Sequence, residues 1–514
     1  MRKEKIRSAG YIALLILAGI SCRLTSPTPA AWSGTPTEDV LTGTNAGLAL
    51  TSRPTFDQTE ERILTPWPTS TEESDVLQNT PTPIDEGSGP WLIYPAPSSE
   101  GIHAYHLGLD TIVEIDLPAP VYWGILNQGF SPDERTLVIR AGSIQNLDEL
   151  ALYQIDLPAF EIKKISPLLS VSLQRKIVND ESARALETLD VITQPGGLAW
   201  SPDGRYLAFT AALNNESSDL YVFDHLNDRI DRVNGLFTQN ATPFWAPGSN
   251  WLVSQEYDRT VSGESWRSVN VTGLRTPGFD SQNTLYLPAS ASQSEEFVGW
   301  INSQNFFSYS LTPDGPAMLR QINIERFRES VIFTGPFDQA AFDPNTSSLA
   351  FSVNTEQASS QGMVAGIYLL RPDHANYSLY RAGDWKRLSW DPGGMFIAES
   401  TQGVLVFNAE GEDIFLLGES NARLSPHGNW MIAWGTGDDS TAGARLYQPP
   451  SSRALQTLVD VPINAALWQP DSKGFFLYGD GHLYHLIFPG LNPKEIAGEF
   501  LEEGTLEMIW VEGD

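Results

Sequence analysis

The segment Leu198-Ala-Trp-Ser-Pro-Asp-Gly-Arg-Tyr-Leu-Ala-Phe-Thr210 decides the fold, because variants of it recur along the chain. Two short apolar runs flank a Ser-Pro-Asp-Gly turn, and the first run ends in an aromatic residue. Proline fixes φ, aspartate accepts hydrogen bonds from the backbone ahead of it, and glycine adopts positive φ, so these residues favour a sharp reversal. The segment therefore predicts a hairpin of two β-strands.

Seven other segments follow this pattern. They are 129–139, 243–254, 297–309 (which lacks the proline), 340–352, 388–400, 422–434 and 466–478. The aligned turn residues are Pro132, Asp133, Pro202, Asp203, Pro247, Pro344, Pro392, Pro426, Pro470 and Asp471. Because aspartate recurs at one position of the turn, we interpret Asp133, Asp203 and Asp471 as turn formers and not as a catalytic set.

The spacing of the copies predicts the architecture. Most copies lie roughly 34 to 55 residues apart, which is the period of a four-stranded propeller blade. A third apolar run and a fourth, more polar run follow many of the hairpins, as in 220–225 and 230–235. We therefore expect an all-β chain folded as a single β-propeller of four-stranded blades.

The two ends of the repeat region predict how the ring closes. Residues 91–118 supply three strands with no motif strand before them, and 506–511 resemble a first strand with none after it. Trp510 stands there where Trp200 stands in the motif. A C-terminal strand that completes the first blade would remove an exposed sheet edge. We expect eight blades, with seven to nine as the open range.

This repeat resembles the WD-like propeller of the TolB periplasmic protein and of many bacterial surface lipoproteins. The resemblance covers about residues 91–511 and rests on the Ser-Pro-Asp-Gly turn with its flanking aromatic residues. It implies the fold, but it does not imply one function, because propellers host unrelated activities.

The N-terminus has the features of a lipoprotein export signal. Basic residues precede an apolar stretch at 11–20, which has the length of a signal-peptide core and is short for a transmembrane helix. The stretch ends at Cys22, the only cysteine. Gly19-Ile-Ser-Cys22 resembles the bacterial lipobox, although that pattern usually has leucine where Gly19 stands. We expect 1–21 to be a signal peptide and Cys22 to carry lipid; ordinary secretion and an uncleaved anchor are the alternatives.

Composition divides the rest of the chain. Residues 22–88 are rich in Thr, Pro, Ser and Glu, which predicts a disordered linker. The propeller domain is expected at 89–514, interrupted by a partly helical insertion at 165–195, where Asp180 is a candidate helix cap. A single cysteine excludes a disulfide, and a net charge of −31 argues against nucleic-acid binding.

The search for chemistry finds few candidates. His103 with His106 and His482 with His485 are the only close histidine pairs, and the i, i+3 spacing puts each pair on opposite faces of a strand. If the ring closes as expected, two of these four residues could still converge near the channel and hold a metal, but we expect no metal, no cofactor and no catalytic residue. The tryptophans beside the turns are a candidate carbohydrate-binding set, although packing between blades is the favoured interpretation. They are Trp123, Trp200, Trp245, Trp300, Trp390, Trp468 and Trp510.

These features predict a monomeric, lipid-anchored propeller on the outer side of the cytoplasmic membrane. The first hypothesis is a non-catalytic module that binds an envelope or extracellular protein or peptide. The second is a solute- or glycan-binding lipoprotein. The third is a divergent propeller hydrolase or lyase.

Overall fold

The computed structural model describes residues 89–512 with several gaps. The gaps are 97–100, 118–125, 144–145, 158, 180–181, 215, 235–237, 260–264, 275–281, 288–293, 312–316, 373–375, 391–394, 401–402, 408–412, 436–442, 450, 452, 497 and 499–505. Cys22, the expected signal peptide and linker, Trp123, Asp180 and Pro392 lie outside the described residues. The chain forms two compact units, Met1–Gly47 and Leu48–Asp514, and every described residue belongs to the second. Within these ranges, no helix is long and apolar enough to cross a membrane.

The described strands form nine antiparallel sheets. The first contains β35 (Ile509–Val511), β1 (Trp91–Pro95), β2 (Gly101–His106) and β3 (Thr111–Asp116). The second contains β4 (Thr136–Ser143), β5 (Asn146–Asp156) and β6 (Glu161–Pro167). The third contains β7 (Leu198–Trp200), β8 (Tyr206–Ala211), β9 (Asp219–Asp224) and β10 (Arg229–Asn234). The fourth contains β11 (Gln239–Trp245), β12 (Trp251–Arg259), β13 (Ser265–Gly273) and β14 (Gln282–Leu287).

The other five sheets continue in chain order. The fifth contains β15 (Ser294–Asn302), β16 (Asn305–Leu311), β17 (Met318–Asn323) and β18 (Arg328–Thr334). The sixth contains β19 (Gln339–Asp343), β20 (Ser348–Val353), β21 (Gly366–Leu370) and β22 (Ser378–Ala382). The seventh contains β23 (Arg387–Trp390), β24 (Phe396–Ser400), β25 (Gly403–Phe407) and β26 (Asp413–Leu417). The eighth contains β27 (Asn421–Leu424), β28 (Met431–Gly435), β29 (Gly443–Tyr447) and β30 (Gln456–Val459). The ninth contains β31 (Ala465–Trp468), β32 (Gly474–Gly479), β33 (His482–Ile487) and β34 (Lys494–Glu495).

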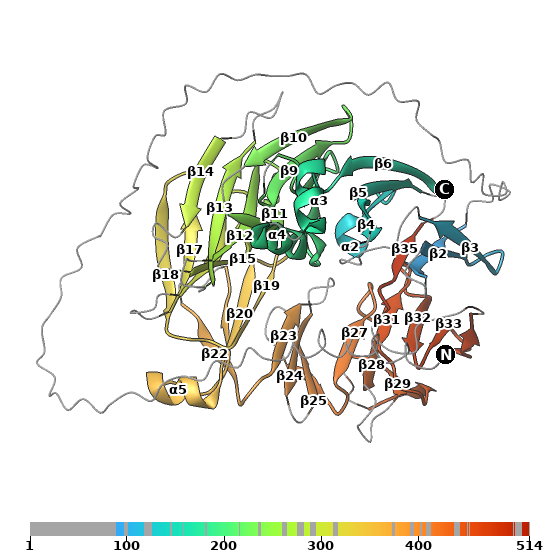
Figure 1. Ribbon diagram of the computed structural model, residues 1–514. Coiled ribbons are helices and arrows are strands. Elements are labelled where there is room, and N and C mark those ends of the chain that lie inside the picture. The colour runs from blue at the N-terminus through green and yellow to red at the C-terminus, as the bar shows by residue number, and fades with distance from the viewer. Residues whose placement is uncertain are drawn as a thin grey trace, which may run out of the picture. The chain divides into compact units, whose positions relative to one another are not determined.

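These sheets are the blades of a β-propeller, so the predicted fold class is confirmed. First strands such as β11, β15, β23, β27 and β31 lie toward the centre of the ring, and strands such as β3, β10, β14 and β18 lie at its rim (Figure 1). The number of blades is nine, which is one more than the preferred eight and within the expected range of seven to nine.

The difference between eight and nine blades concerns the second blade, whose first strand is hard to recognise. A short helix, α2 (Leu126–Gly129), stands where a first strand would begin. Only an isolated bridge between Phe130 and Leu137 marks that strand, and the remaining sheet has three strands. The motif copy at 129–139 therefore belongs to a blade whose innermost strand is reduced to one residue.

The C-terminal strand closes the ring as expected. β35 pairs antiparallel with β1, with Ile509 opposite Ile93 and Val511 opposite Trp91. The half-buried carboxylate of Glu507 accepts hydrogen bonds from the backbone amides of Leu126 and Asn127, the latter at 3.1 Å. The C-terminal segment thus ties the first blade to the start of the second.

Each blade packs against a neighbouring blade on both faces, and alternate side chains of a strand contribute to different interfaces. In β8, Leu207 and Phe209 pack toward the second blade, whereas Tyr206 and Ala208 pack toward the fourth. The described core consists of nine such hydrophobic clusters, one at each interface between neighbouring blades. This arrangement explains why strands such as β8 read as continuous apolar runs without a polar face.

A repeated indole contact joins the inner strands of neighbouring blades. A tryptophan at the motif position of Trp200 donates its Nε1–H to the backbone carbonyl that precedes the same position in the previous blade. The contacts are Trp200 to Gly129 at 2.8 Å, Trp245 to Ala199 at 2.9 Å, Trp300 to Phe244 at 3.1 Å, Trp390 to Ala341 at 3.1 Å and Trp468 to Arg423 at 3.2 Å. For these five residues, the predicted packing between blades is confirmed.

Four described blades lack this contact. In the first blade Trp510 donates to Glu512, and in the second blade the position is Phe130, which has no N–H donor on its side chain. In the sixth blade Phe342 takes the motif position, and its ring lies against Gly299, where a Cβ would come within 2.5 Å of the ring. In the eighth blade the position is Leu424, which has neither an N–H donor nor the length of an indole. The interface between β23 and β27 is therefore not bridged by an indole.

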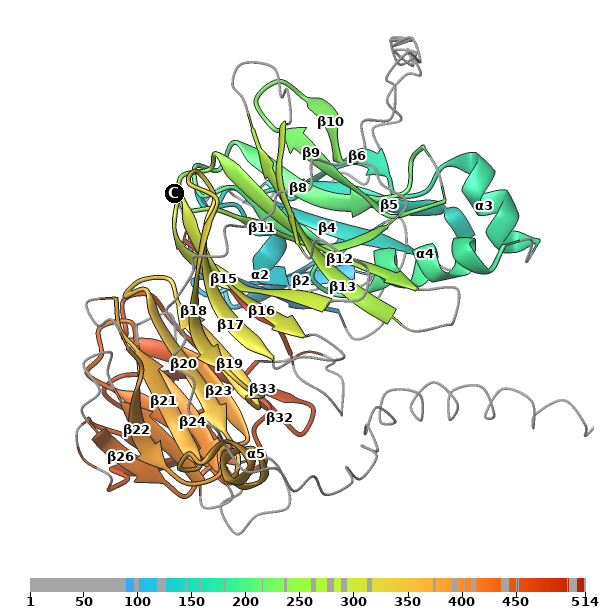
Figure 2. The same cartoon turned by 90° about the vertical axis from the view of Figure 1, so that its left-hand side faces the viewer.

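The insertion at 165–195 contains α3 (Val171–Val178) and α4 (Ala183–Thr193). The side chain of Ser182, not Asp180, caps α4 by accepting from the amide of Ala185 at 3.3 Å. Arg140 is buried and donates to the carbonyls of Ile192 and Gln194 at the end of α4, the latter at 2.5 Å. These helices pack on β5 and β11, and α5 (Thr355–Gln361) follows β20 (Figure 2).

Candidate functional site

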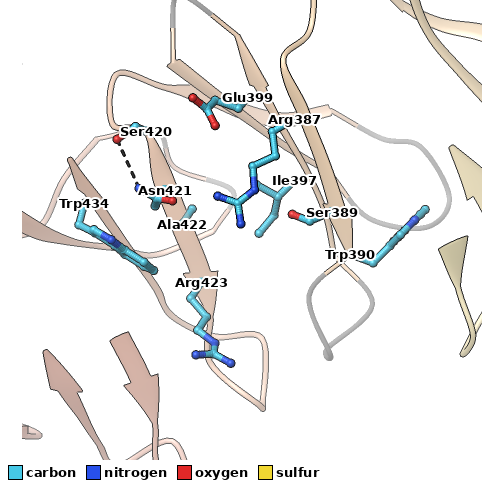
Figure 3. Close-up of a pocket in the computed structure, with 10 residues that line it drawn as sticks. All are labelled: Arg387, Ser389, Trp390, Ile397, Glu399, Ser420, Asn421, Ala422, Arg423 and Trp434. Atoms are coloured by element: carbon cyan, nitrogen blue, oxygen red, sulfur yellow. Dashed lines mark hydrogen bonds between the residues drawn. The ribbon is translucent and has the colours of Figure 1, made fainter. Parts of the chain in front are cut away.

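A pocket of about 270 Å³ lies at the interface between the seventh and eighth blades. Strands β23, β24, β27 and β28 surround it (Figure 3). We call it the β23–β27 pocket. Its lining consists of Arg387, Ser389, Trp390, Ile397, Glu399, Ser420, Asn421, Ala422, Arg423 and Trp434.

Strand alternation places one set of side chains on the face of the seventh blade that looks toward β27. Arg387 lies opposite Glu399 and Ser389 lies opposite Ile397 in the β23–β24 pair. Because residues two apart share a face, these four side chains line the same wall. The neighbouring positions Phe396 and Ala398 pack on the other side, toward the sixth blade.

Small side chains explain why this interface has a cavity. The cluster between the seventh and eighth blades contains Ala422 and Ala433 on the side of the eighth blade. Leu424 adds only a partly buried aliphatic group where most described blades have an indole or a phenyl ring. Without an aromatic ring reaching toward Ser389, the space beside β23 remains open.

Three charged side chains line the pocket, two basic and one acidic. Arg423 donates from Nη1 to the carbonyl oxygen of Ala466 at 2.5 Å, so its side chain reaches toward the ninth blade. The side chain of Arg387 has no hydrogen bond or ion pair with any described residue (Figure 3). Glu399 lies across the β23–β24 pair from Arg387, yet the two do not form an ion pair in the described structure.

A buried carboxylate holds the start of β27. Glu419 directly precedes the lining residue Ser420 and accepts from Arg445 Nη1 and from the Tyr447 hydroxyl, both at 2.7 Å. Burial raises the pKa of Tyr447, and its hydrogen bond to Glu419 raises it further. Because Arg445 already pairs with Glu419, that carboxylate does not neutralise the guanidinium groups in the pocket.

The β2 histidines are engaged separately. His106 is buried and its Nδ1 accepts from the amide of Leu109 at 2.9 Å. The ring of His103 lies edge-on to Tyr94, with 5.4 Å between centroids. Burial lowers the pKa of His103, partly offset by Glu114.

The β33 histidines have other partners. His482 Nδ1 lies 2.7 Å from Glu495 Oε1 at the surface. His485 is buried, stacks on Phe476 and lies 3.0 Å from Gln469 Nε2. Across the described ranges, no group of three or more His, Cys, Asp and Glu side chains could hold a metal ion.

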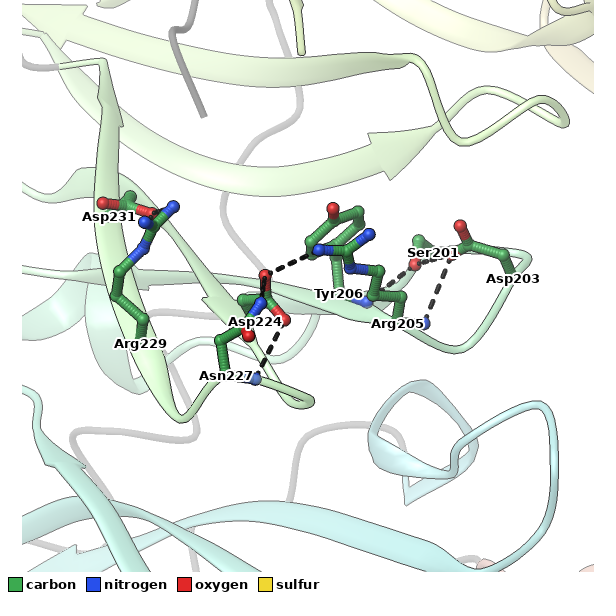
Figure 4. A network of polar contacts seen from close by, with 8 residues as sticks. All are labelled: Ser201, Asp203, Arg205, Tyr206, Asp224, Asn227, Arg229 and Asp231. Carbon is green, nitrogen blue, oxygen red and sulfur yellow. Dashed lines mark hydrogen bonds and ion pairs between the residues drawn. The ribbon is translucent and has the colours of Figure 1, made fainter. Parts of the chain in front are cut away.

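The motif aspartates lie in the turns. Asp203 accepts from the Ser201 hydroxyl at 2.6 Å and from the Arg205 amide at 3.2 Å (Figure 4). Asp133 repeats both contacts with Ser131 and Arg135. Asp471 accepts from the amide of Lys473 at 2.9 Å. These carboxylates bond to their own turns, and they lie on separate blades.

A polar network joins the turn of the third blade, through Arg205, to Asp224 at the end of β9. Arg205 Nη2 donates to Asp224 Oδ2 at 3.2 Å, and Asn227 Nδ2 donates to the same oxygen at 2.7 Å (Figure 4). Burial alone would raise the pKa of Asp224, but the hydrogen bonds from Asn227 and Arg205 lower it. The network stabilises the β8–β9 hairpin.

Sequence reasoning missed the lining residues of the pocket except Trp390, which belongs to the candidate carbohydrate-binding set. Arg387, Ser389 and Glu399 occupy ordinary strand positions within a motif copy. The one available signal was Leu424, which departs from the aromatic residue expected before the turn. A departure from the repeat marks an altered interface, but half of the side chains that line the pocket come from the preceding blade.

No protein-family profile matches this chain, and no curated protein is significantly similar to it in sequence. Many solved structures match its fold. A eukaryotic initiation factor aligns with a TM-score of 0.53 at 12% identity, covering 82% of this chain and 98% of that one. At this identity the likeness concerns the fold alone, and it supports a propeller.

The matched structures also include TolB, the protein that the repeat resembles, and other propeller proteins. TolB from Acinetobacter baumannii aligns with a TM-score of 0.27 at 12% identity, covering 57% of this chain and 63% of that one. An oligogalacturonate lyase in complex with manganese aligns with a TM-score of 0.36 at 13% identity, covering 56% of this chain and 88% of that one.

Proposed function

We propose that this chain is a membrane-anchored, non-catalytic interaction module that lies outside the cytoplasm and binds a protein or peptide in the β23–β27 pocket. The observation that carries the proposal is the pocket itself. It opens at a blade interface that lacks the indole contact, and its wall combines Arg387, Ser389 and Glu399 with two indoles. Concave sites with a few convergent polar groups are the usual places where ligands bind.

The chemistry of the lining favours binding over catalysis. Ser389 and Ser420 have no histidine beside them in the lining, so neither has the base that a serine nucleophile requires. Among the described lining residues Glu399 is the only carboxylate, whereas glycoside hydrolysis generally uses two. The described lining therefore lacks the paired groups on which these two kinds of hydrolysis depend.

The size of the pocket suits a short part of a larger partner. Sites for small molecules have volumes of roughly 300 to 1,000 Å³. At about 270 Å³, this pocket accommodates one or two residues of a peptide and not a long polymer. A partner protein would insert such a segment while the rest of it contacts the surrounding rim.

A glycan is the second candidate, because Trp390 and Trp434 line the pocket and indole rings stack on sugar faces. The alternative makes a different prediction. A sugar would raise the thermal unfolding temperature of the protein by itself, in the absence of any peptide.

The anchor is a separate part of the proposal, supported by Cys22 at the end of the apolar stretch 11–20. Two acyl chains would give stable membrane attachment at about 0.8 kcal/mol per buried methylene. Mass spectrometry of the mature N-terminus should find a lipidated Cys22. A Cys22→Ala variant should move from the membrane fraction to the soluble fraction, and a variant that stays in the membrane would contradict the anchor.

Site-specific photo-crosslinking tests the binding proposal directly. A photoreactive amino acid at Ser389, inside the pocket, should capture a discrete protein or peptide from intact cells. The matched control replaces Leu379, which is 42% exposed on β22 at the outer part of the sixth blade. Equal adducts from both positions, or none from Ser389, would contradict the proposal.

A further inference from the structure

We infer that the β23–β27 pocket recognises a carboxylate group of the bound peptide and that the Arg387 guanidinium is the group that pairs with it. The inference rests on the proposed function, because it names the chemical group that the pocket selects in a peptide partner. It goes beyond that function by assigning one residue to recognition.

Arg387 differs from other arginines at the blade interfaces. Arg320 pairs with the buried Glu295, Arg232 with the buried Asp219, and Arg445 with the buried Glu419. Arg387 lies in the wall of a pocket and has no such carboxylate partner among the described residues. A guanidinium presents its N–H groups as a planar fork that matches a carboxylate in a bidentate geometry.

The charges around Arg387 leave the pocket open to an anionic group. Glu419 is already paired with Arg445, at 2.7 Å, so it adds no free negative charge. Arg423 adds a second positive charge to the lining, and the one described hydrogen bond of its side chain goes to a neutral carbonyl. Two guanidinium groups and one carboxylate line the pocket, although the whole chain carries a net charge of −31.

Glu399 supplies a hydrogen-bond acceptor for a peptide N–H, a group that a simple anion does not have. It lies opposite Arg387 across the β23–β24 pair. A peptide carboxylate can pair with Arg387 while a nearby peptide N–H donates to Glu399. Two sources offer this chemistry: the C-terminal carboxylate of a peptide, and the side chain of an aspartate or glutamate within it.

Three sets of random pentapeptides separate these sources. The first has free C-termini and no acidic residue, the second has amidated C-termini and one acidic residue, and the third has amidated C-termini and no acidic residue. Binding of each set to the full-length mature protein is measured by fluorescence anisotropy. We expect one or both carboxylate-bearing sets to bind at least about tenfold more tightly than the third set.

The variants test the role of Arg387. Arg387→Gln should lower the affinity for the carboxylate-bearing sets by about tenfold, and Arg387→Lys should retain an intermediate affinity, because lysine keeps the charge without the fork. Arg328→Gln is the matched control, since Arg328 is an exposed residue of β18 outside the pocket lining. Circular dichroism and the thermal midpoint verify that each variant is folded.

The outcomes separate the inference from the proposed function. If all three sets bind equally, or if Arg387→Gln binds like the native chain, carboxylate recognition is wrong while peptide binding stands. If no set binds and Ser389 captures no partner in cells, both are wrong. Tighter binding of a carboxylate-bearing set, lost in Arg387→Gln and kept in Arg328→Gln, supports both.

Discussion

The indole Nε1 of Trp245 lies 2.9 Å from the backbone carbonyl oxygen of Ala199, which belongs to the preceding blade. Four more tryptophans repeat this relationship around the described ring. Each contact satisfies an inner-strand carbonyl that faces the next blade and fixes the distance between the two strands. The contacts thus act at the part of each interface that is nearest the centre.

Removing one of these contacts should weaken the ring. Trp245→Phe keeps an aromatic ring against Tyr206 but removes the donor to Ala199, so the free energy of unfolding should fall by about 1 to 2 kcal/mol. Trp510→Phe is the matched control, because the Trp510 indole donates to the exposed Glu512 and not to another blade. Equilibrium urea unfolding of both variants checks the difference. Equal losses of unfolding free energy in the two variants would show that the hydrogen bond between blades does not contribute to stability.

A substitution in the closing strand should matter more than the same substitution at an exposed position of another strand. Ile509 is 2% exposed in β35, where it pairs with β1, so Ile509→Asp buries a charge and should destabilise the protein by about 3 kcal/mol or more. Ile487→Asp changes the same residue type where it is 53% exposed, and it should cost less than about 0.5 kcal/mol. Thermal unfolding distinguishes the two. Similar midpoints for both variants would argue against closure by β35.

Acid should destabilise the ninth blade through His485. Burial lowers the pKa of this histidine to about 4, with nearby Lys494 lowering it and Asp110 opposing. The unfolded chain takes up the proton near pH 6.5, whereas the folded protein does so only near its lowered pKa, so stability falls as the pH drops from 6.5 toward 4. The ring of Phe476 and the amide of Gln469 also face the imidazole.

The variant His485→Gln removes this proton uptake. Between pH 7 and 4.5, its free energy of unfolding should fall by about 2 kcal/mol less than that of the native chain. His482→Gln, which alters the exposed histidine of the same strand, serves as the control. Parallel pH profiles for the native chain and His485→Gln would show that His485 does not contribute to the acid sensitivity.

Much of the fold could be predicted because its determinants are local. The Ser201 hydroxyl and the Asp203 carboxylate stabilise the turn through hydrogen bonds that span only a few residues. Each motif copy therefore predicts its own hairpin. Trp510 predicted the closing strand, because it matches Trp200 of the motif and no second strand follows it. The total number of blades was harder to predict, because the first strand of the second blade is reduced to the bridge at Phe130.

The pocket could not be predicted from the repeat in the same way. Its wall combines side chains that are far apart in sequence, such as Arg387 and Ala422, and the alternation that makes them neighbours depends on the register of two blades. Its cavity arises because Leu424 lacks the aromatic ring that most described blades have at this position. The cap of α4 was misplaced for a simpler reason, since Ser182 is as good an N-cap as Asp180 and lies directly before the helix.

The substitution Leu424→Trp tests the central claim most directly, because it restores at the eighth blade the residue that most described blades have. The new indole should donate to the carbonyl of Ser389 and fill the β23–β27 pocket. We predict that this variant is as stable as the native chain or more so, and that it binds the partner captured at Ser389 at least about tenfold more weakly. Unchanged affinity in a folded Leu424→Trp protein, measured beside Trp245→Phe as the control, would contradict the claim that this pocket is the binding site.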